Sequence, residues 1–147
     1  MKSLKFFGII FAIMTVALVL VSCGGAEASA EIVSSSDSAV VISVNETSGS
    51  LEDILESLKA DGKLDYSASE GEYGIYIESV NGRVADPSSE YWAIYTSLSE
   101  LDGVIYSSAD FGTYDFDGKT LCSASYGASG LIAVEGELYA LVLESWQ

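Results

Sequence analysis

The chain has 147 residues, of which 22 are acidic and 6 are basic, and its formal net charge is −16. This length is typical of one domain, and so strong a negative charge argues against nucleic acid and anionic lipid surfaces as partners. The chain has no histidine, which excludes His-based acid–base catalysis, Ser-His-Asp and Cys-His nucleophiles, and nearly all zinc sites built on imidazole.

The N-terminus has the pattern of a bacterial lipoprotein signal. Two lysines precede an apolar run over residues 6–21, which is typical of a secretory signal. The run ends at Ser22-Cys23, and a small residue directly before a cysteine resembles the lipobox, in which that cysteine is diacylated. We therefore expect residues 1–22 to be a signal peptide and Cys23 to carry lipid on the extracytoplasmic side of the cell membrane. Residues 23–37, rich in Ser, Ala, Glu and Gly, are expected to form a flexible tether.

Two alternatives remain for this segment. Its apolar run is short for a retained membrane span, which needs about 20 residues. Ordinary signal peptidase could cleave at Ala28-Ser29-Ala30, but Cys23 makes lipidation the preferred interpretation. Processing at Cys23 removes two basic residues and no acidic ones, so the mature chain carries a net charge of −18, which favours solubility. Cys122 is then the only free thiol, and no intrachain disulfide is expected.

The domain is predicted to span residues 38–147. Residues 38–44 are β-branched and apolar and predict a first strand. A helix should follow, because Ser50 is a good N-cap, acidic residues occupy the first turn, and Gly62 is a stop signal. Its apolar positions fall at i, i+3, i+4 and i+7: Leu51, Ile54, Leu55 and Leu58. This leucine-rich face should pack on a sheet.

The middle of the chain predicts a loop, a hairpin and a tyrosine-rich strand. Residues 63–72 are polar and turn-prone, and residues 73–80 form a strand that Asn81-Gly82 turns into a short return. After a loop around Pro87, the run from Tyr91 to Ser97 alternates with a period of two residues. We expect Trp92 and Ile94 to face the core and the helix, and Tyr91 and Tyr95 to lie on the surface.

The last third predicts further antiparallel strands. Residues 98–108 fit a short helical turn followed by a strand, and Asp117-Gly118 is a hairpin turn. Residues 131–134 and 138–146 flank Glu135-Gly136 as a third hairpin, and the final strand, apolar on both faces, is expected inside the sheet. The predicted fold class is α+β, with one helix packed on a mainly antiparallel sheet of about seven or eight strands.

Two acidic motifs have simpler explanations than metal binding. The segment Asp115-Phe116-Asp117-Gly118 matches half of a calcium loop, but the later ligand positions hold Lys119, Leu121 and Cys122. Asp110-Phe111-Gly112 spells the magnesium motif of kinases without a phosphate loop or a catalytic loop. Carboxylate pairs alone define no site, so we predict no metal, no cofactor, no catalytic residue and no enzyme activity.

The nine tyrosines carry more information than the carboxylates. Seven fall in or beside predicted strands: Tyr73, Tyr76, Tyr91, Tyr95, Tyr106, Tyr114 and Tyr126. Cross-strand packing with hydroxyl groups at the surface would explain them. A flat aromatic platform for a planar ligand or a partner is the functional alternative, with Tyr91 and Tyr95 as its most plausible pair.

Taken in order, these segments resemble one family over residues 40–144. The matching segments are the helix from Ser50 to Leu55, the run Tyr73 to Gly82, Tyr91-Trp92, Gly127-Ala128-Ser129, and the turn glycine Gly136. The chain resembles the domain of unknown function 4430 family, which is similar to the C-terminal β-domain of transcobalamin and intrinsic factor.

The resemblance implies a β-grasp-like domain of the soluble-ligand-binding type. In the cobalamin carriers the corresponding domain covers one face of the corrin, with contacts from the Tyr-Trp strand and from the loop before the last hairpin. Transferred to this chain, the candidate ligand-binding residues are Tyr91, Trp92, Tyr95, Tyr126 and Ser129. The chain lacks the carriers' helical domain, and its residues 98–122 form an insertion next to the expected site.

The sequence therefore predicts a lipid-anchored, non-enzymatic binding protein outside the cytoplasmic membrane. Its expected ligand is a small planar molecule, of which a corrinoid such as cobalamin is the one the resemblance implies. The alternative is a cell-envelope interaction or adhesion module whose partner is another envelope protein.

Overall fold

The computed structural model describes residues 29–146, so the predicted signal peptide, Cys23 and residues 23–28 lie outside the described residues. No helix among the described residues is both long enough and apolar enough to span a membrane. The described part of the chain contains one helix and eleven strands, and every strand pair is antiparallel. The predicted α+β class, with one helix and antiparallel strands, is confirmed. The predicted number of strands, seven or eight, was too low.

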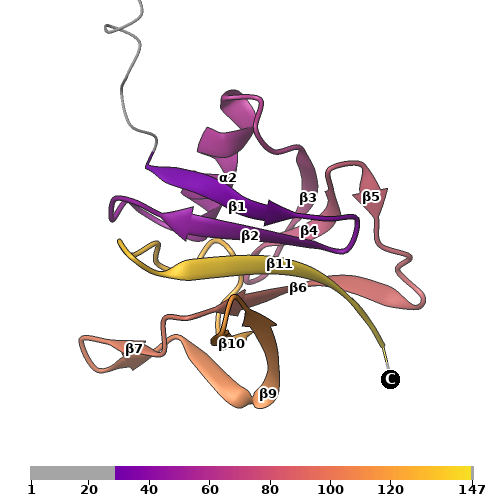
Figure 1. The fold of residues 1–147 in the computed structure, drawn as a ribbon. Helices are drawn as coiled ribbons and strands as arrows, with labels where there is room; N and C mark the ends of the chain where they lie inside the picture. Colours follow the sequence, from indigo (N-terminus) through magenta and orange to yellow (C-terminus); the bar gives the residue numbers. More distant parts are fainter. Residues whose placement is uncertain (1–28, 147) are drawn as a thin grey trace, which may run out of the picture.

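A six-stranded sheet organises the fold, in the order β1-β2-β11-β6-β10-β9 (Figure 1). Its strands are β1 (Ala30–Ser35), β2 (Ala39–Val44), β11 (Leu138–Ser145), β6 (Glu90–Thr96), β10 (Lys119–Ala124) and β9 (Ser107–Phe116). As predicted, the final strand β11 lies inside the sheet, where it pairs with β2 on one side and with β6 on the other.

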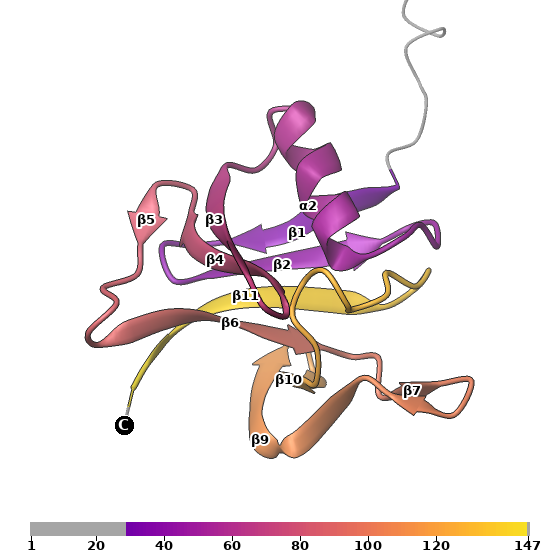
Figure 2. The ribbon, with the colours of Figure 1, turned by 180° about the vertical axis from the view of Figure 1, so that it is seen from behind.

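The helix α2 (Leu51–Ala60) and a small sheet cover one face of the large sheet (Figure 2). The small sheet consists of β3 (Tyr66–Gly71), β4 (Gly74–Val80) and β5 (Arg83–Val84). The helix begins as predicted at Ser50, whose hydroxyl accepts a hydrogen bond from the Asp53 N–H while the Asp53 carboxylate accepts one from the Ser50 N–H.

Two hydrophobic clusters form on the two faces of the large sheet. The cluster on the helix side contains Trp92 and all four predicted helix positions, with Ile94 packed against it. The second contains Tyr95, Leu121 and Val142, with Tyr114 and Phe116 packed beside it. The period-two alternation of β6 is therefore confirmed, because consecutive side chains reach different clusters.

The predicted tether ends earlier than residue 37. Residues 30–35 form β1, which pairs with β2 from Ala30↔Val44 to Ser35↔Val40. Ala30 is buried in the core, and Ile32 packs against it. The serine-rich composition suggested a linker, but the partner strand supplies the hydrogen bonds and the apolar contacts that make this segment an edge strand.

Three other local predictions were wrong. Residues 66–71, predicted as part of a loop, form β3, a largely exposed strand that pairs with β4. The helical turn expected within residues 98–108 is a tight hairpin of β7 (Glu100–Leu101) and β8 (Val104–Ile105). Residues 131–134 form no strand with β11. Instead, the Leu131 carbonyl accepts from the Leu51 N–H at 2.8 Å, and the Ala133 N–H donates to the Gly49 carbonyl at 3.0 Å.

The turn predictions at Asn81-Gly82, Asp117-Gly118 and Glu135-Gly136 are confirmed as turns. Asn81 and Asp117 adopt positive φ angles of 49° and 48°, which these residue types tolerate and which the following glycines share. Local chemistry favours these reversals, and hydrogen bonds from the Asp65 N–H to Asn81 Oδ1 and from the Gly136 N–H to the Val44 carbonyl hold two of them in place.

Candidate functional site

A hollow of about 340 Å³ opens where β4, β6 and the end of β10 meet. We call it the aromatic hollow. Five consecutive β6 residues border it, together with parts of β4, β9 and the segment after β10. Its lining residues are Ile75, Tyr76, Ile77, Tyr91, Trp92, Ala93, Ile94, Tyr95, Phe111, Ser123, Ala124, Ser125, Tyr126 and Gly127.

The hollow exists because β10 leaves β6. The two strands pair only at Cys122↔Thr96 and Ser123↔Tyr95, after which Ala124 pairs with Ser107 of β9. The Ser125 N–H then donates to the Tyr106 carbonyl at 2.9 Å, which takes residues 125–127 further from β6. A wedge therefore opens beside residues 91–94.

A wide bulge in β9 supplies one wall. The register jumps from Cys122↔Thr113 to Ser123↔Ser108, so residues 109–112 have no partner in β10. Gly112 has a φ of 128°, and the bulge holds Phe111 with 82% of its side chain exposed. The segment Asp110-Phe111-Gly112, which has no role in metal binding in our interpretation, is thus the segment that brings an aromatic ring to the hollow.

Four of the five predicted binding residues line this hollow: Tyr91, Trp92, Tyr95 and Tyr126. Tyr126 is 44% exposed, and its ring lies 5.6 Å from that of Tyr106. Tyr91 is half-buried and stacks on Trp146 with ring centroids 4.2 Å apart. One face of the Tyr91 ring is therefore already occupied within the chain.

The expected surface position of Tyr95 was wrong. Only 6% of Tyr95 is exposed, because β9 folds over it, with the Tyr114 ring 6.0 Å away. Its hydroxyl donates to Glu144 Oε1 at 2.8 Å, and burial together with that carboxylate raises the pKa of Tyr95 to about 12. Trp92 is 5% exposed as predicted, and its Nε1–H donates to the Arg83 carbonyl at 3.1 Å.

Ser129, the fifth predicted residue, does not line the hollow. Its Oγ accepts a hydrogen bond from the Ile75 N–H at 3.0 Å and so fastens β4 to the loop that follows β10. A Cβ at Gly74 would lie 2.5 Å from this hydroxyl, so the two segments approach as closely as a glycine allows. Ser129 positions the wall of the hollow rather than offering a free hydroxyl.

Sequence reasoning missed two aromatic residues of the site. Tyr76 projects from β4 and is 48% exposed, and Phe111 comes from the segment that was treated as an insertion. The strand alternation of residues 74–80 would have placed Tyr76 on the exposed face. The local signal for the bulge is Gly112, since a glycine inside a strand often marks one.

The lining of the hollow is uncharged and about equally polar and apolar. Its lining contains no Asp, Glu, Lys, Arg or Cys, and tyrosine hydroxyls, two serines and backbone groups are its polar atoms. Among residues 29–146 there is no cluster of three or more side chains able to hold a metal ion, and no buried side-chain polar atom lacks a hydrogen bond. Such a surface suits stacking on a ring or packing against apolar side chains.

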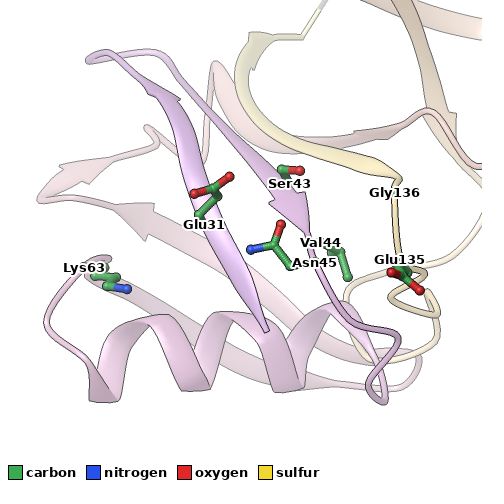
Figure 3. A pocket seen from close by; sticks show the side chains of 7 residues that line it. All are labelled: Glu31, Ser43, Val44, Asn45, Lys63, Glu135 and Gly136. Carbon is green, nitrogen blue, oxygen red and sulfur yellow. The ribbon is translucent and has the colours of Figure 1, made fainter. Parts of the chain in front are cut away.

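A larger and more open hollow of about 650 Å³ lies on the other side of the fold (Figure 3). Glu31, Ser43 and Asn45 come from β1, β2 and the residue after β2, while Lys63 and Glu135 stand at opposite ends. No ion pair links its charged residues, since the one ion pair of the described chain joins Arg83 to Glu90. Its charges stand on an open rim and converge on no common point, so the aromatic hollow is the better candidate site.

Comparison with known proteins adds no relative. No model of a protein family matches the chain, and no curated protein matches it either.

Proposed function

We propose that the protein is a lipid-anchored, extracytoplasmic binding protein with a β-grasp-like domain, and that the aromatic hollow holds a small ligand without chemical conversion. One observation carries the proposal. Four residues that the family resemblance implied as ligand contacts, drawn from two segments about 30 positions apart, line the same hollow.

The properties of the hollow support a flat, uncharged ring as the bound group. Ligand sites commonly have volumes of about 300–1,000 Å³ and apolar, aromatic walls with a few polar atoms. The exposed rings of Phe111 and Tyr126, from two separate segments of the chain, offer faces for stacking. At about 340 Å³ the hollow would hold one side of a corrin macrocycle and leave the rest in solvent.

The direct test mixes the full chain in detergent micelles with cobalamin or cobinamide at tens of micromolar and separates the mixture by gel filtration. We expect visible absorbance to co-elute with the protein. Phe111→Ala and Tyr126→Ala should reduce the co-eluting absorbance at least threefold, because each removes a stacking face worth about 1 kcal/mol.

Tyr73→Ala is the matched control. Tyr73 is 87% exposed and does not line the hollow, so its loss should leave binding unchanged. Absence of co-eluting absorbance with the wild type would exclude corrinoids as the ligand.

A second function, protein interaction in the cell envelope, is favoured by a different observation. The strand β6 has β11 on one side along its whole length but β10 on the other side only at its end. An exposed strand edge is a recognised docking site for extended peptide segments.

A further inference from the structure

The N-terminal half of β6 presents unpaired backbone groups to the aromatic hollow. In an antiparallel pair, alternate residues direct both N–H and C=O toward the same neighbour. The Ser97 N–H donates to the Leu138 carbonyl, and the Trp146 N–H donates to the Ser89 carbonyl, so odd-numbered residues of β6 face β11. Trp92 and Ile94 therefore direct their N–H and C=O groups away from β11.

Among residues 29–146 no strand pairs with Trp92, whereas the bridge Ser123↔Tyr95 gives the Ile94 carbonyl to the Ala124 N–H and leaves the Ile94 N–H without a ladder partner. The β10 ladder reaches β6 only at Thr96 and Tyr95, and β4 faces β6 across the hollow without joining it in a ladder. Five successive residues, 91–95, border the hollow although their side chains alternate between the two faces of the sheet. The hollow therefore runs along the edge of the strand.

The hollow continues toward the start of β6. A second hollow of about 290 Å³ is lined by Tyr76, Glu78, Val84, Ala85, Pro87 and Glu90, and it shares Tyr76 with the aromatic hollow. We call the two together the β4–β6 groove. It follows β6 from Glu90 to Tyr95, a span of about 17–20 Å for six extended residues. A segment of that length would run along the whole unpaired edge, whereas a flat ring would leave that edge unused.

The charges of the groove select among possible occupants. Neither hollow is lined by a lysine or arginine, and Glu78 and Glu90 lie at one end. Glu90 is paired with Arg83 at 2.9 Å, whereas Glu78 has no cation partner among residues 29–146. A second copy of the chain would bring another strongly acidic surface, so a segment with lysine or arginine is the complementary occupant.

We infer that the β4–β6 groove binds an extended basic peptide segment, which pairs as a strand with Trp92 and with the Ile94 N–H and directs a cationic side chain to Glu78. This inference rests on the interaction role proposed above for the β6 edge. Phe111 and Tyr126 would then contact apolar side chains of the segment. A bound ring and a bound peptide would exclude one another, because they share the aromatic hollow.

The test follows amide hydrogen exchange in the full chain in detergent micelles. The probes are acetylated, amidated hexapeptides in which lysine or arginine alternates with valine, isoleucine or tyrosine. At saturating peptide we expect exchange at Trp92 and Ile94 to slow at least tenfold. Exchange at Tyr91 and Ala93, which already face β11, should not change and serves as an internal control.

Two matched controls separate strand pairing from unspecific attraction. Peptides carrying a methyl group on every backbone nitrogen cannot donate to β6 from either edge and should bind at least tenfold more weakly. Glu78→Lys should weaken binding about threefold to tenfold, while Glu100→Lys, the same charge change on the exposed β7, should have no effect.

Several results would overturn the inference. One is the absence of protection at Trp92 and Ile94 with all the peptides, and another is equal binding of the N-methylated peptides. A third is protection that rises with protein concentration alone, which would identify a second copy as the occupant. Cobinamide binding without peptide binding would overturn this inference and leave the ring-binding proposal intact. Peptide binding without cobinamide binding would support the inference and reject corrinoids.

Discussion

Two aromatic residues of β6 have different roles. Trp92 fills the core beneath α2 and holds β5 through its hydrogen bond to the Arg83 carbonyl, whereas Tyr95 lies under β9 and donates to the Glu144 carboxylate. Alternation in the sequence was enough to separate the two faces. It was not enough to predict that Tyr95 is covered, because the cover comes from a strand some 15 residues later whose path depends on a bulge.

Buried tyrosines make the fold sensitive to alkali. Tyr139 is fully buried; its hydroxyl accepts from the Val134 N–H at 2.9 Å and donates to the Ile132 carbonyl at 2.7 Å. Burial raises its pKa to about 12, as it does for Tyr95. Burial and the hydrogen bond to Glu56 also raise the pKa of Tyr66.

These pKa values predict a loss of stability above pH 10. The unfolded chain releases its tyrosine protons near pH 10, while the folded chain keeps them until about pH 12, so the free energy of unfolding falls as the pH rises between these values. Urea midpoints at pH 8, 10 and 11 should decrease in that order. Tyr95→Phe should make the decrease shallower, and a midpoint independent of pH would contradict the assignment.

At the level of elements, α2 and the tight turns were predictable because their signals are local. A capping residue, an apolar period and a stop glycine all lie within residues 50–62. The strands β1 and β3 were not predictable in this way, because their serines and glutamates have little preference for strands. Their conformation is set by pairing with β2 and β4, which are more apolar.

The helix cap offers a test at this scale. Ser50→Ala removes the side chain that accepts from the Asp53 N–H and should lower the free energy of unfolding by about 1 kcal/mol. Ser69→Ala, at an exposed position of β3, is the control and should have an effect below about 0.5 kcal/mol. Urea denaturation of the two variants measures the difference; equal effects would mean that the cap does not stabilise the helix.

At the level of the whole molecule, the candidate site joins segments that are distant in sequence. The family resemblance predicted that β6 and the segment after β10 contribute to a site. Tyr76 and Phe111 could not be assigned to the site, since their positions depend on how the small sheet sits on the large one and on the four-residue bulge of β9. The unpaired edge of β6 likewise depends on the strand order of the sheet, and no local residue pattern predicts it.

The early start of β1 also changes the expected anchoring. Only seven residue steps separate Cys23 from Ala30, so a lipid on Cys23 would hold the sheet within about 25 Å of the membrane. We expect the expressed protein to partition into the detergent phase of a Triton X-114 extract, and Cys23→Ser to move it to the aqueous phase. An aqueous wild-type protein would reject the lipid anchor.

The open edge of β6 also bears on why the chain is so acidic. An unpaired strand beside exposed rings is the kind of surface through which copies of a protein stick edge to edge and aggregate. A net charge far from zero keeps such copies apart by repulsion. The same negative charge attracts a basic peptide segment, so the strand edge stays accessible to it. On this interpretation the negative charge prevents aggregation through the β6 edge. The repulsion disappears near the isoelectric point of about 4.1, where we expect the protein to aggregate.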